Sequence, residues 1–394
     1  MKFLHISDLH IGKVVNDFSM LEDQQFILNQ IAGMAQANQV DAVVIAGDVY
    51  DRAIPSGEAV TLLDKFLTEL SVHGIQVLMI SGNHDSPERL SFGRELLGRQ
   101  GVYIAGVQEE KLVTVEFRER IQDSLRKEFV TQFVLLPFLK PAQVQAATSG
   151  EAVEKVLAQY WEQEKKKGRK KKNRVLVTHF FVTDSGREPE LSDSETTIHV
   201  GGLDNVEFSV FKGFDYVALG HIHKPQQIGR YPAWYAGSPL KYSFGETKQE
   251  KCALLVHMGE NGLEEVRKLS LRPMRQMRKI SGSLQELLAK GQEDTGKQDY
   301  IQANLSDEGE LINPIGVLRS VYPHVMQIVR MERQDMGELG FEASGSRRLA
   351  EKRDVLALFA DFYQEVRGEA LTEEGRKIVE NLVKELEGQK GTKT

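Results

Sequence analysis

Five short apolar stretches of the sequence each end at side chains that can bind a metal ion. The stretches are KFLHISDLH, DAVVIAGDVYD, LMISGNHD, RVLVTHF and DYVALGHIH. The side chains at their ends are Asp8, His10, Asp48, Asn83, His179, His221 and His223. Short β-branched runs bounded by glycine, with helical patterns between them, are typical of strands buried on both faces of an α/β sheet. The chain is therefore limited to folds in which several strands deliver polar residues to one place.

Ligands of such sheets gather beyond the carboxyl ends of the strands. We therefore expect the seven side chains to lie together at one edge of the sheet. Carboxylate, amide and imidazole groups without a thiolate suit manganese, iron or zinc with open positions better than a closed structural zinc site. Seven ligands are too many for one tetrahedral ion. They fit two ions about 3.5 to 4 Å apart with one bridging carboxylate, the arrangement used for in-line displacement at phosphorus.

Single residues of this pattern also have simpler interpretations. Asn, Asp and Gly after a strand are ordinary turn formers, and a single histidine is often only a core or surface residue. We apply that interpretation to the five histidines outside the pattern, which are His5, His73, His199, His257 and His324. The other five histidines of the chain lie at the predicted strand ends.

Five motifs resemble, in order, those of the calcineurin-like metallophosphoesterases. They are DLH at 8–10, GDVYD at 47–51, GNHD at 82–85, TH at 178–179 and GHIH at 220–223. Within that superfamily, GDVYDRAIPS at 47–56 and AGSPLKYSFGE at 236–246 resemble the SbcD family of nucleases. The resemblance covers nearly the whole chain, and its specific motifs lie in the first two thirds. It implies an α/β fold, a β-sandwich flanked by helices, that uses two divalent metal ions, with Mn²⁺ as the expected metal.

The resemblance also implies a role for each site residue. One ion would be held by Asp8, His10, Asp48 and His223, and the other by Asp48, Asn83, His179 and His221. His84 resembles the catalytic histidine of the family, which is not a ligand and faces the scissile phosphate. Asp85 is expected to hold the turn or to orient a neighbour. No nucleophilic side chain is needed, so we interpret the single cysteine, Cys252 in the run CALLVH, as a buried strand residue.

The implied activity is that of a DNA double-strand exonuclease and single-strand or hairpin endonuclease. Its implied partners are DNA and an SbcC-type ATPase with a coiled coil, in DNA repair and recombination, with a homodimer inside a heterotetramer. One alternative is a phosphatase or small-molecule phosphodiesterase of the same superfamily, and another is a scaffold with structural metals or none. GDVYDR also resembles the serine/threonine protein phosphatases, but Ala53 and Asp85 depart from their pattern. The complete ligand set and His84 speak against a scaffold.

The net charge of the chain and one basic run bear on whether it binds DNA by itself. A net charge of −7 argues against a protein that coats DNA by itself. The basic run KKKGRKKKNR at 165–174 is interpreted as a solvated loop rather than a DNA contact. One cysteine excludes an internal disulfide, and we expect neither a signal peptide nor a membrane span, which fits a cytoplasmic location.

The order of apolar runs, glycines and helical patterns along the sequence predicts that the chain divides into four segments. A metallophosphoesterase domain covers 1–271, and alternating strands and helices predict a small α/β capping domain at 272–336. A linker with three glycines and two serines covers 337–348. Residues 349–394 are predicted to form a hairpin of two amphipathic helices that binds a partner, the second helix beginning at Thr372.

Overall fold

The computed structural model of the protein describes residues 1–120, 128–168, 172–192, 204–331, 372, 375–377 and 379. The chain divides into two compact units, Met1–Arg330 and Met331–Thr394. In the second unit the described residues include one helical turn at 375–377. Thr372 Oγ1 accepts a hydrogen bond from the Gly375 amide at 3.2 Å, as expected for the residue before a helix. The predicted linker and most of the predicted helical hairpin lie outside the described residues.

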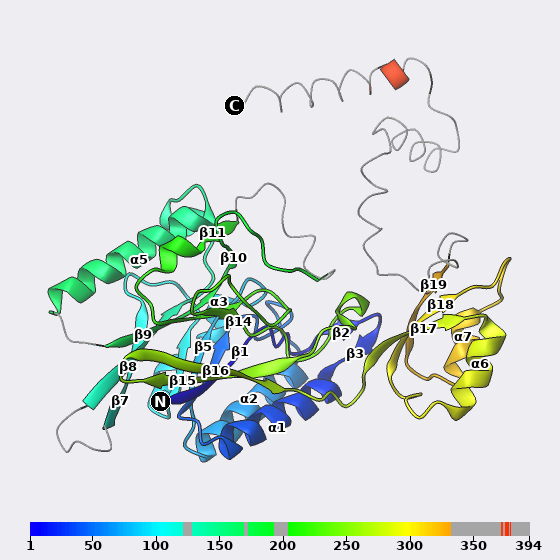
Figure 1. The fold of residues 1–394 in the computed structure, drawn as a ribbon, viewed down its shortest axis with the longest axis horizontal. Helices are drawn as coiled ribbons and strands as arrows, with labels where there is room; N and C mark the ends of the chain where they lie inside the picture. Colours follow the sequence, from blue (N-terminus) through cyan, green and yellow to red (C-terminus); the bar gives the residue numbers. More distant parts are fainter. Residues whose placement is uncertain are drawn as a thin grey trace. The chain divides into compact units, whose positions relative to one another are not determined.

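Two six-stranded sheets form the centre of the first unit (Figure 1). The first sheet has the order β16-β15-β1-β4-β5-β6. Its strands are β1 (Lys2–Ile6), β4 (Ala42–Ala46), β5 (Gln76–Ile80), β6 (Val102–Ala105), β15 (Cys252–Gly259) and β16 (Gly262–Ser270). The strands β1, β4, β5 and β6 run parallel, whereas β15 lies antiparallel to β1.

The second sheet has the order β13-β14-β12-β9-β8-β7. Its strands are β7 (Val113–Arg120), β8 (Glu128–Leu136), β9 (Asn173–His179), β12 (Tyr216–Gly220), β13 (Gln226–Gln227) and β14 (Ala233–Tyr235). Its central strands β8, β9, β12 and β14 are parallel, with antiparallel strands at both edges. Parallel strands of this kind are buried on both faces, which explains their continuous apolar runs.

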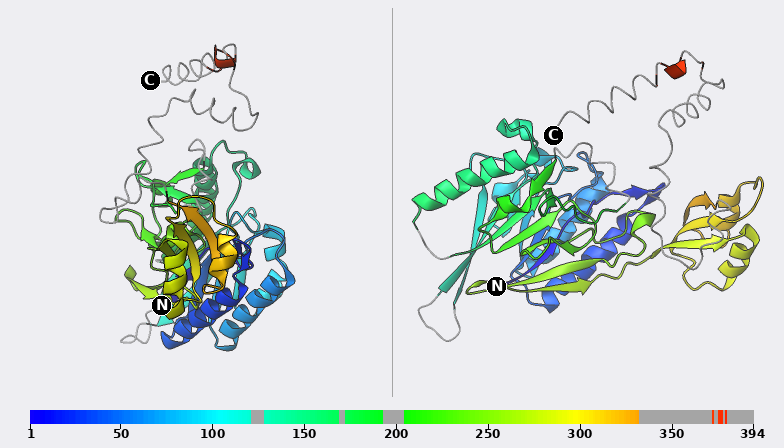
Figure 2. Two further views of the ribbon diagram at one scale, coloured as in Figure 1. Left: turned by 90° about the vertical axis from the view of Figure 1, so that its right-hand side faces the viewer. Right: turned by 45° about the horizontal axis from the view of Figure 1, so that its top comes forward.

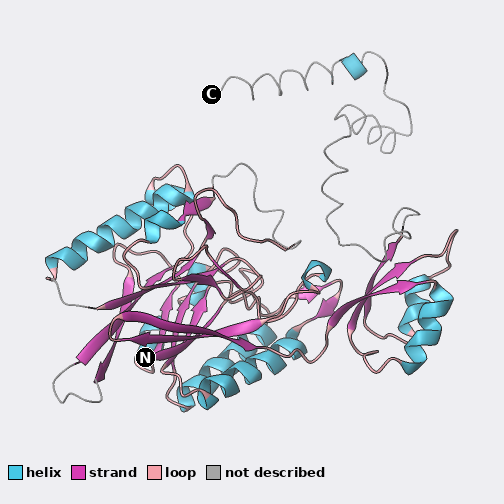
Figure 3. Ribbon diagram, in the orientation of Figure 1, coloured by secondary structure: helices cyan, strands magenta, loops and turns pink. Residues whose placement is uncertain are grey.

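Apolar side chains fill the space between the sheets and cover their outer faces. Phe3 and Leu78 from the first sheet meet Phe133 and Tyr216 from the second in one buried cluster. The helices α1 (Leu21–Ala37) and α2 (Gly57–Val72) cover the first sheet, and α5 (Ser149–Lys166) covers the second (Figure 2). The predicted β-sandwich flanked by helices is confirmed, and Figure 3 shows its layers.

Short elements join the main strands and helices. They are β2 (Val14–Val15), β3 (Phe18–Ser19), α3 (Pro87–Leu90), α4 (Arg94–Gly98), η1 (Pro141–Val144), β10 (Phe181–Thr183), β11 (Asn205–Glu207), η2 (Phe208–Phe211) and η3 (Phe244–Glu246). No helix among the described ranges is both long and apolar enough to span a bilayer.

A separate three-stranded sheet follows β16. Its strands are β17 (Met277–Gly282), β18 (Tyr300–Leu305) and β19 (Val325–Arg330). The helices α6 (Leu284–Glu293) and α7 (Pro314–Arg319) lie between successive strands in the chain. The three strands are parallel and enclose a small core with the two helices. The strands and helices predicted for this segment are therefore present, and the domain bounds 1–271 and 272–336 stay a prediction. Asp23 on α1 accepts hydrogen bonds from Arg275 and Tyr300, which fastens this sheet to the sandwich.

Candidate metal centre

The strand ends that carry the candidate ligands meet, but they come from two sheets. The strands β1, β4 and β5 belong to the first sheet, whereas β9 and β12 belong to the second. The expectation of a single sheet edge was therefore wrong, because an apolar run indicates burial on both faces and not which sheet a strand joins. Hydrogen bonds join the two edges directly. His179 Nδ1 lies 2.8 Å from the Ala46 carbonyl oxygen, and the His221 amide donates to Asp8.

Three of the candidate ligands form a buried group on one side of the centre. The ligand atoms of Asp8, His10 and His223 all lie within 4.8 Å of one another. His10 Nε2 is 3.2 Å from His223 Nε2. All three side chains are buried. We call this group the Asp8 position.

A second group lies beside it. The Asn83 amide oxygen, Oδ1, is 3.1 Å from His179 Nε2 and 3.0 Å from His221 Nδ1. His179 is buried, whereas Asn83 is exposed and His221 is half-buried, so this group opens toward solvent. We call it the Asn83 position.

Asp48 lies between the two positions. Its Oδ2 atom is 3.7 Å from His10 Nε2 and 3.3 Å from His179 Nε2. Its other oxygen, Oδ1, accepts a hydrogen bond from the His84 amide at 2.9 Å. A carboxylate that faces both histidine groups is suited to bridge two cations.

The backbone at these positions is strained. Asp8, His10, Asp48 and His221 have positive φ angles of 52°, 45°, 48° and 101°. Such conformations cost about 1 to 3 kcal/mol for a residue with a side chain and cluster at functional sites. At Gly82, a Cβ atom would collide with the Asp48 carboxylate. The glycine of the GNHD motif thus permits the close approach of two loops.

His84 and Asp85 follow Asn83 and have different partners. His84 Nδ1 lies 3.0 Å from the Asp51 carbonyl oxygen, and the His84 ring is half-buried beside His10. One His84 nitrogen also lies within 4.8 Å of ligand atoms of His10 and Asp48, so the geometry permits a ligand role as well as a catalytic one. The Asp85 carboxylate accepts hydrogen bonds from the Val49, Tyr50 and Gly82 amides. Asp85 therefore holds the loop after β4 against the loop after β5.

The electrostatics of the buried carboxylates differ. Burial raises the pKa of Asp8 to about 6, although the nearby histidines His179 and His223 oppose this change. Burial would also raise the pKa of Asp48, but His179 and His10 outweigh it and hold that pKa well below its usual range. An anionic Asp48 beside imidazole nitrogens is a combination of donors that suits a cation.

The donors present fit divalent metal ions. They offer carboxylate and imidazole atoms within 4.8 Å in overlapping groups, and the Asn83 amide oxygen lies 3.1 Å from His179 Nε2. The buried His10 Nδ1 has no hydrogen-bond partner among the described residues, and lies 3.6 Å from Asp51 Oδ1. Oxygen and nitrogen donors of this mixture suit Mn²⁺, Fe²⁺ or Zn²⁺.

The sequence analysis did not identify Glu246, whose carboxylate contacts a proposed ligand histidine. Glu246 is fully buried, its Oε1 atom is 3.4 Å from His223 Nδ1, and its Oε2 atom accepts a hydrogen bond from Lys251. Burial would raise the pKa of Glu246, but its bonds to His223 and Lys251 outweigh this and hold the pKa at about 2. The available signal was that Glu246 closes the motif AGSPLKYSFGE.

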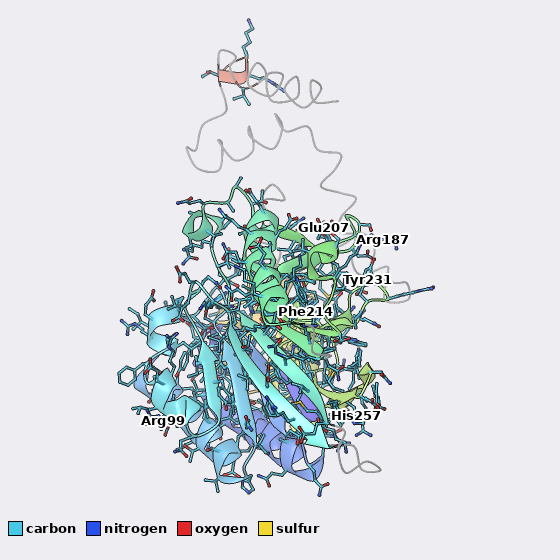
Figure 4. The ribbon with its side chains drawn as sticks, turned by 90° about the vertical axis from the view of Figure 1, so that its left-hand side faces the viewer. Arg99, Arg187, Glu207, Phe214, Tyr231 and His257 are labelled. Carbon is cyan, nitrogen blue, oxygen red and sulfur yellow. The ribbon has the colours of Figure 1, made fainter. Side chains whose placement is uncertain are left out.

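The histidines outside the pattern have ordinary partners where the structure describes them. His5 bonds Tyr216, His73 bonds the Glu69 carbonyl, and His324 bonds the Gln298 carbonyl. His257 on β15, labelled in Figure 4, forms an ion pair with Glu264 in which His257 Nδ1 lies 3.1 Å from Glu264 Oε2. His199 lies outside the described residues. Cys252 is buried, as expected.

Three residues of the basic run 165–174 form ion pairs with glutamates of the sandwich. Lys167, Lys172 and Arg174 all lie within 4.0 Å of the nearly buried Glu164 carboxylate. Lys172 also pairs with Glu116 at 2.6 Å. Lys165 and Lys166 belong to α5, and Asn173 and Arg174 belong to β9, so the predicted loop is limited to 167–172, of which residues 169–171 lie outside the description. The absence of a DNA contact stays a prediction.

Comparisons with known proteins match both parts of the chain. Residues 1–225 match the calcineurin-like phosphoesterase family model, and residues 273–367 match the model described as type 5 capsule protein repressor C-terminal domain. The chain is 32% identical to the SbcD component of the SbcCD nuclease of Staphylococcus epidermidis, covering 83% of this chain and 85% of that protein. It is 29% identical to the same component from Staphylococcus saprophyticus, covering 98% of both. A dimetal phosphatase from Danio rerio is 14% identical with a TM-score of 0.38, covering 69% of this chain and 98% of that one.

Proposed function

The chain belongs to the calcineurin-like phosphoesterase family and, within it, to the SbcD nucleases, and from this premise we propose that it cleaves DNA as an exonuclease at duplex ends and as an endonuclease in single strands and hairpins. It is a metal-dependent phosphodiesterase. The observation that carries the proposal is the convergence of the other six motif side chains around Asp48.

We assign the Asp8 position to one ion and the Asn83 position to the other, with Asp48 as the bridge. Asp8, His10, Asp48 and His223 would hold the first ion, and Asp48, Asn83, His179 and His221 the second. Mn²⁺ is the metal proposed. When bound, the two ions supply neutralisation of the phosphodiester charge and activation of water.

The buried side chains of the site are proposed to bind the metal ions, and the side chains nearer to solvent are proposed to contact the DNA. Asp8, His10 and His179 are buried and fix where the ions can lie. Asn83, His84 and His221 lie toward solvent, where a DNA strand can reach them. His84, held through Nδ1–H by the Asp51 carbonyl, presents Nε2 to the leaving 3′ oxygen; in the doubly protonated imidazolium form the ring donates its Nε2 proton there and becomes neutral.

DNA and an SbcC-type ATPase with a coiled coil are the proposed partners. The relatives are named as components of an SbcCD nuclease, which supports a complex for this chain. The net charge of −7 supports a partner that contributes to DNA binding, since affinity for DNA depends on cations that meet phosphates. Repair and recombination of DNA are the proposed setting.

A homodimer inside this complex is proposed to form through α2 and the segment 87–98. Val60, Val72, Phe92 and Leu96 are large apolar side chains left exposed there, and Phe92 is 86% exposed. Val60, Val72 and Phe92 also line an apolar cavity of about 420 Å³. Large apolar side chains left exposed around an apolar cavity are typical of protein interfaces. A second copy of the chain is the proposed occupant, and Phe92→Glu should shift the sedimentation coefficient from dimer to monomer.

End-labelled linear duplex, hairpin and single-stranded circular DNA test the proposed activity, each with Mn²⁺ or Mg²⁺. We expect shortening of the duplex from its ends, opening of the hairpin and nicking of the circle. Asp48→Ala is the inactive control. Hydrolysis of a small chromogenic diester without cleavage of any DNA would instead favour a small-molecule phosphodiesterase.

A further inference from the structure

The buried Glu246 carboxylate contacts the ring of His223, one of the proposed ligand histidines. Glu246 lies in the turn η3, outside the five strand-end motifs, and its side chain is fully buried. Its Oε1 atom is 3.4 Å from His223 Nδ1, while His223 Nε2 faces His10 Nε2 at 3.2 Å. The two ring nitrogens of His223 therefore have separate tasks, one toward Glu246 and one toward the Asp8 position.

Lys251 holds the Glu246 carboxylate in place. The Lys251 ammonium donates to Glu246 Oε2 at 2.6 Å, to the His223 carbonyl at 2.9 Å and to Ser238 Oγ at 2.9 Å. The Tyr242 amide and the Ser243 hydroxyl also donate to Glu246. A buried charge pair with this many hydrogen bonds fixes one arrangement, because moving either partner leaves a buried group unsatisfied.

The other histidine of the Asp8 position also faces a carboxylate, at a distance too long for a hydrogen bond. His10 Nδ1 lies 3.6 Å from Asp51 Oδ1, and Asp51 is paired with Lys13 at 2.7 Å. In the Asn83 position, His179 Nδ1 instead faces a neutral backbone carbonyl, that of Ala46. Both histidines of the Asp8 position thus face a carboxylate, and this position also contains the Asp8 carboxylate as a proposed ligand.

We propose that Glu246, clamped by Lys251, is a positioning residue that aims His223 Nε2 at the Asp8 position and makes this position bind its ion more tightly than the Asn83 position. The inference rests on the ligand assignment of the proposed function. A carboxylate that accepts the Nδ1 proton fixes the tautomer and orientation of the ring and makes Nε2 a more basic donor. The stronger position fills first as the metal concentration rises.

Calorimetric titration of metal-free protein with MnCl₂ tests the proposal without any measurement of activity. Wild-type protein should bind two ions in two separate steps. Glu246→Gln keeps the shape but removes the charge, and it should weaken the tighter step about 10- to 100-fold while the weaker step is unchanged. Asn83→Ala should remove the weaker step alone, which identifies the two positions.

Two further variants keep the result interpretable. Glu246→Gln combined with Lys251→Met removes the buried charge pair without leaving an unpaired ammonium, and it should show the same selective loss. Glu164→Gln is the matched control, because Glu164 is a nearly buried, lysine-paired glutamate on α5. Both metal-binding steps of this variant should equal those of the wild-type protein.

The outcomes separate the inference from the proposed function. Equal weakening of both steps, or unchanged binding in both Glu246 variants, would overturn the positioning role while the two-ion assignment stands. Wild-type protein that binds fewer than two ions would contradict the proposed function itself.

Discussion

The imidazole Nδ1 atom of His84 lies 3.0 Å from the backbone carbonyl oxygen of Asp51. A carbonyl oxygen only accepts hydrogen bonds, so Nδ1 carries the proton and Nε2 is the nitrogen available to a substrate. The contact also ties the catalytic candidate to the loop of Asp48, because Asp51 follows three residues later. The orientation of His84 therefore does not depend on a bound metal.

His84→Ser tests whether this histidine acts without binding an ion. We expect the variant to keep both manganese ions and to lose about 10²- to 10⁴-fold in turnover, the usual contribution of a positioned acid or base. Metal content by atomic emission and hydrolysis of a chromogenic phosphodiester provide the two measurements. Loss of one ion would show that His84 is a ligand.

Asp48→Ala tests the bridge. Asp48 Oδ2 faces His10 on one side and His179 on the other, so its removal should reduce binding at both positions and abolish cleavage. The circular dichroism spectrum should remain that of the wild-type protein, because the sandwich core lies below the site. Two equivalents of bound manganese in this variant would refute the assignment.

Local patterns predicted much of this site. Val43, Val44 and Ile45 indicate a buried strand, and the Gly-Asp that follows it predicts where Asp48 lies. The pairing of β1, β4 and β5 in one sheet and of β9 and β12 in another could not be predicted, because burial on both faces is the same in either sheet. Glu246 was missed for a related reason: its role depends on contacts with His223 and Lys251 that form only when distant loops meet.

His5 should make the stability of the protein depend on pH. It is fully buried, and burial lowers its pKa from 6.5 to about 3, despite a backbone hydrogen bond that opposes the change. The unfolded chain therefore takes up a proton below pH 6.5 that the folded chain does not, so stability falls as the pH falls from 6.5 toward 3. The contribution is about 1.4 kcal/mol per pH unit.

Urea unfolding of metal-free wild-type and His5→Leu protein between pH 7 and pH 5 measures this contribution. The variant is expected to start with lower stability, because Tyr216 loses its partner at 3.0 Å. Its unfolding free energy should nevertheless fall less steeply with pH. Parallel curves for the two proteins would exclude His5 as the source.

Asp23 should be the main polar link between the sandwich and the small sheet. Its buried Oδ2 atom accepts hydrogen bonds from Tyr300 and Arg275, both at 2.6 Å. Asp23→Ala should lower the free energy of unfolding by about 2 to 3 kcal/mol, and Tyr300→Phe by about 1 kcal/mol. Glu22→Ala is the control, since its ion pair with the same Arg275 is exposed and should contribute under about 1 kcal/mol. Equal losses for Asp23→Ala and Glu22→Ala in urea unfolding would contradict this.

The segment 349–394, most of which lies outside the described residues, is predicted to dock on the ATPase partner. If its apolar stripes merely completed a core, deletion of 349–394 would make the protein unstable or cause it to aggregate. If they dock, the truncated chain should stay folded and still hydrolyse a chromogenic diester with manganese, because the proposed ligands all precede Lys224. It should no longer co-purify with an SbcC-type ATPase. Phe359→Glu with Leu382→Glu should have the same effect at full length, since charge in the stripe opposes burial. A truncated chain that binds the ATPase as tightly as the full chain would show that docking lies elsewhere.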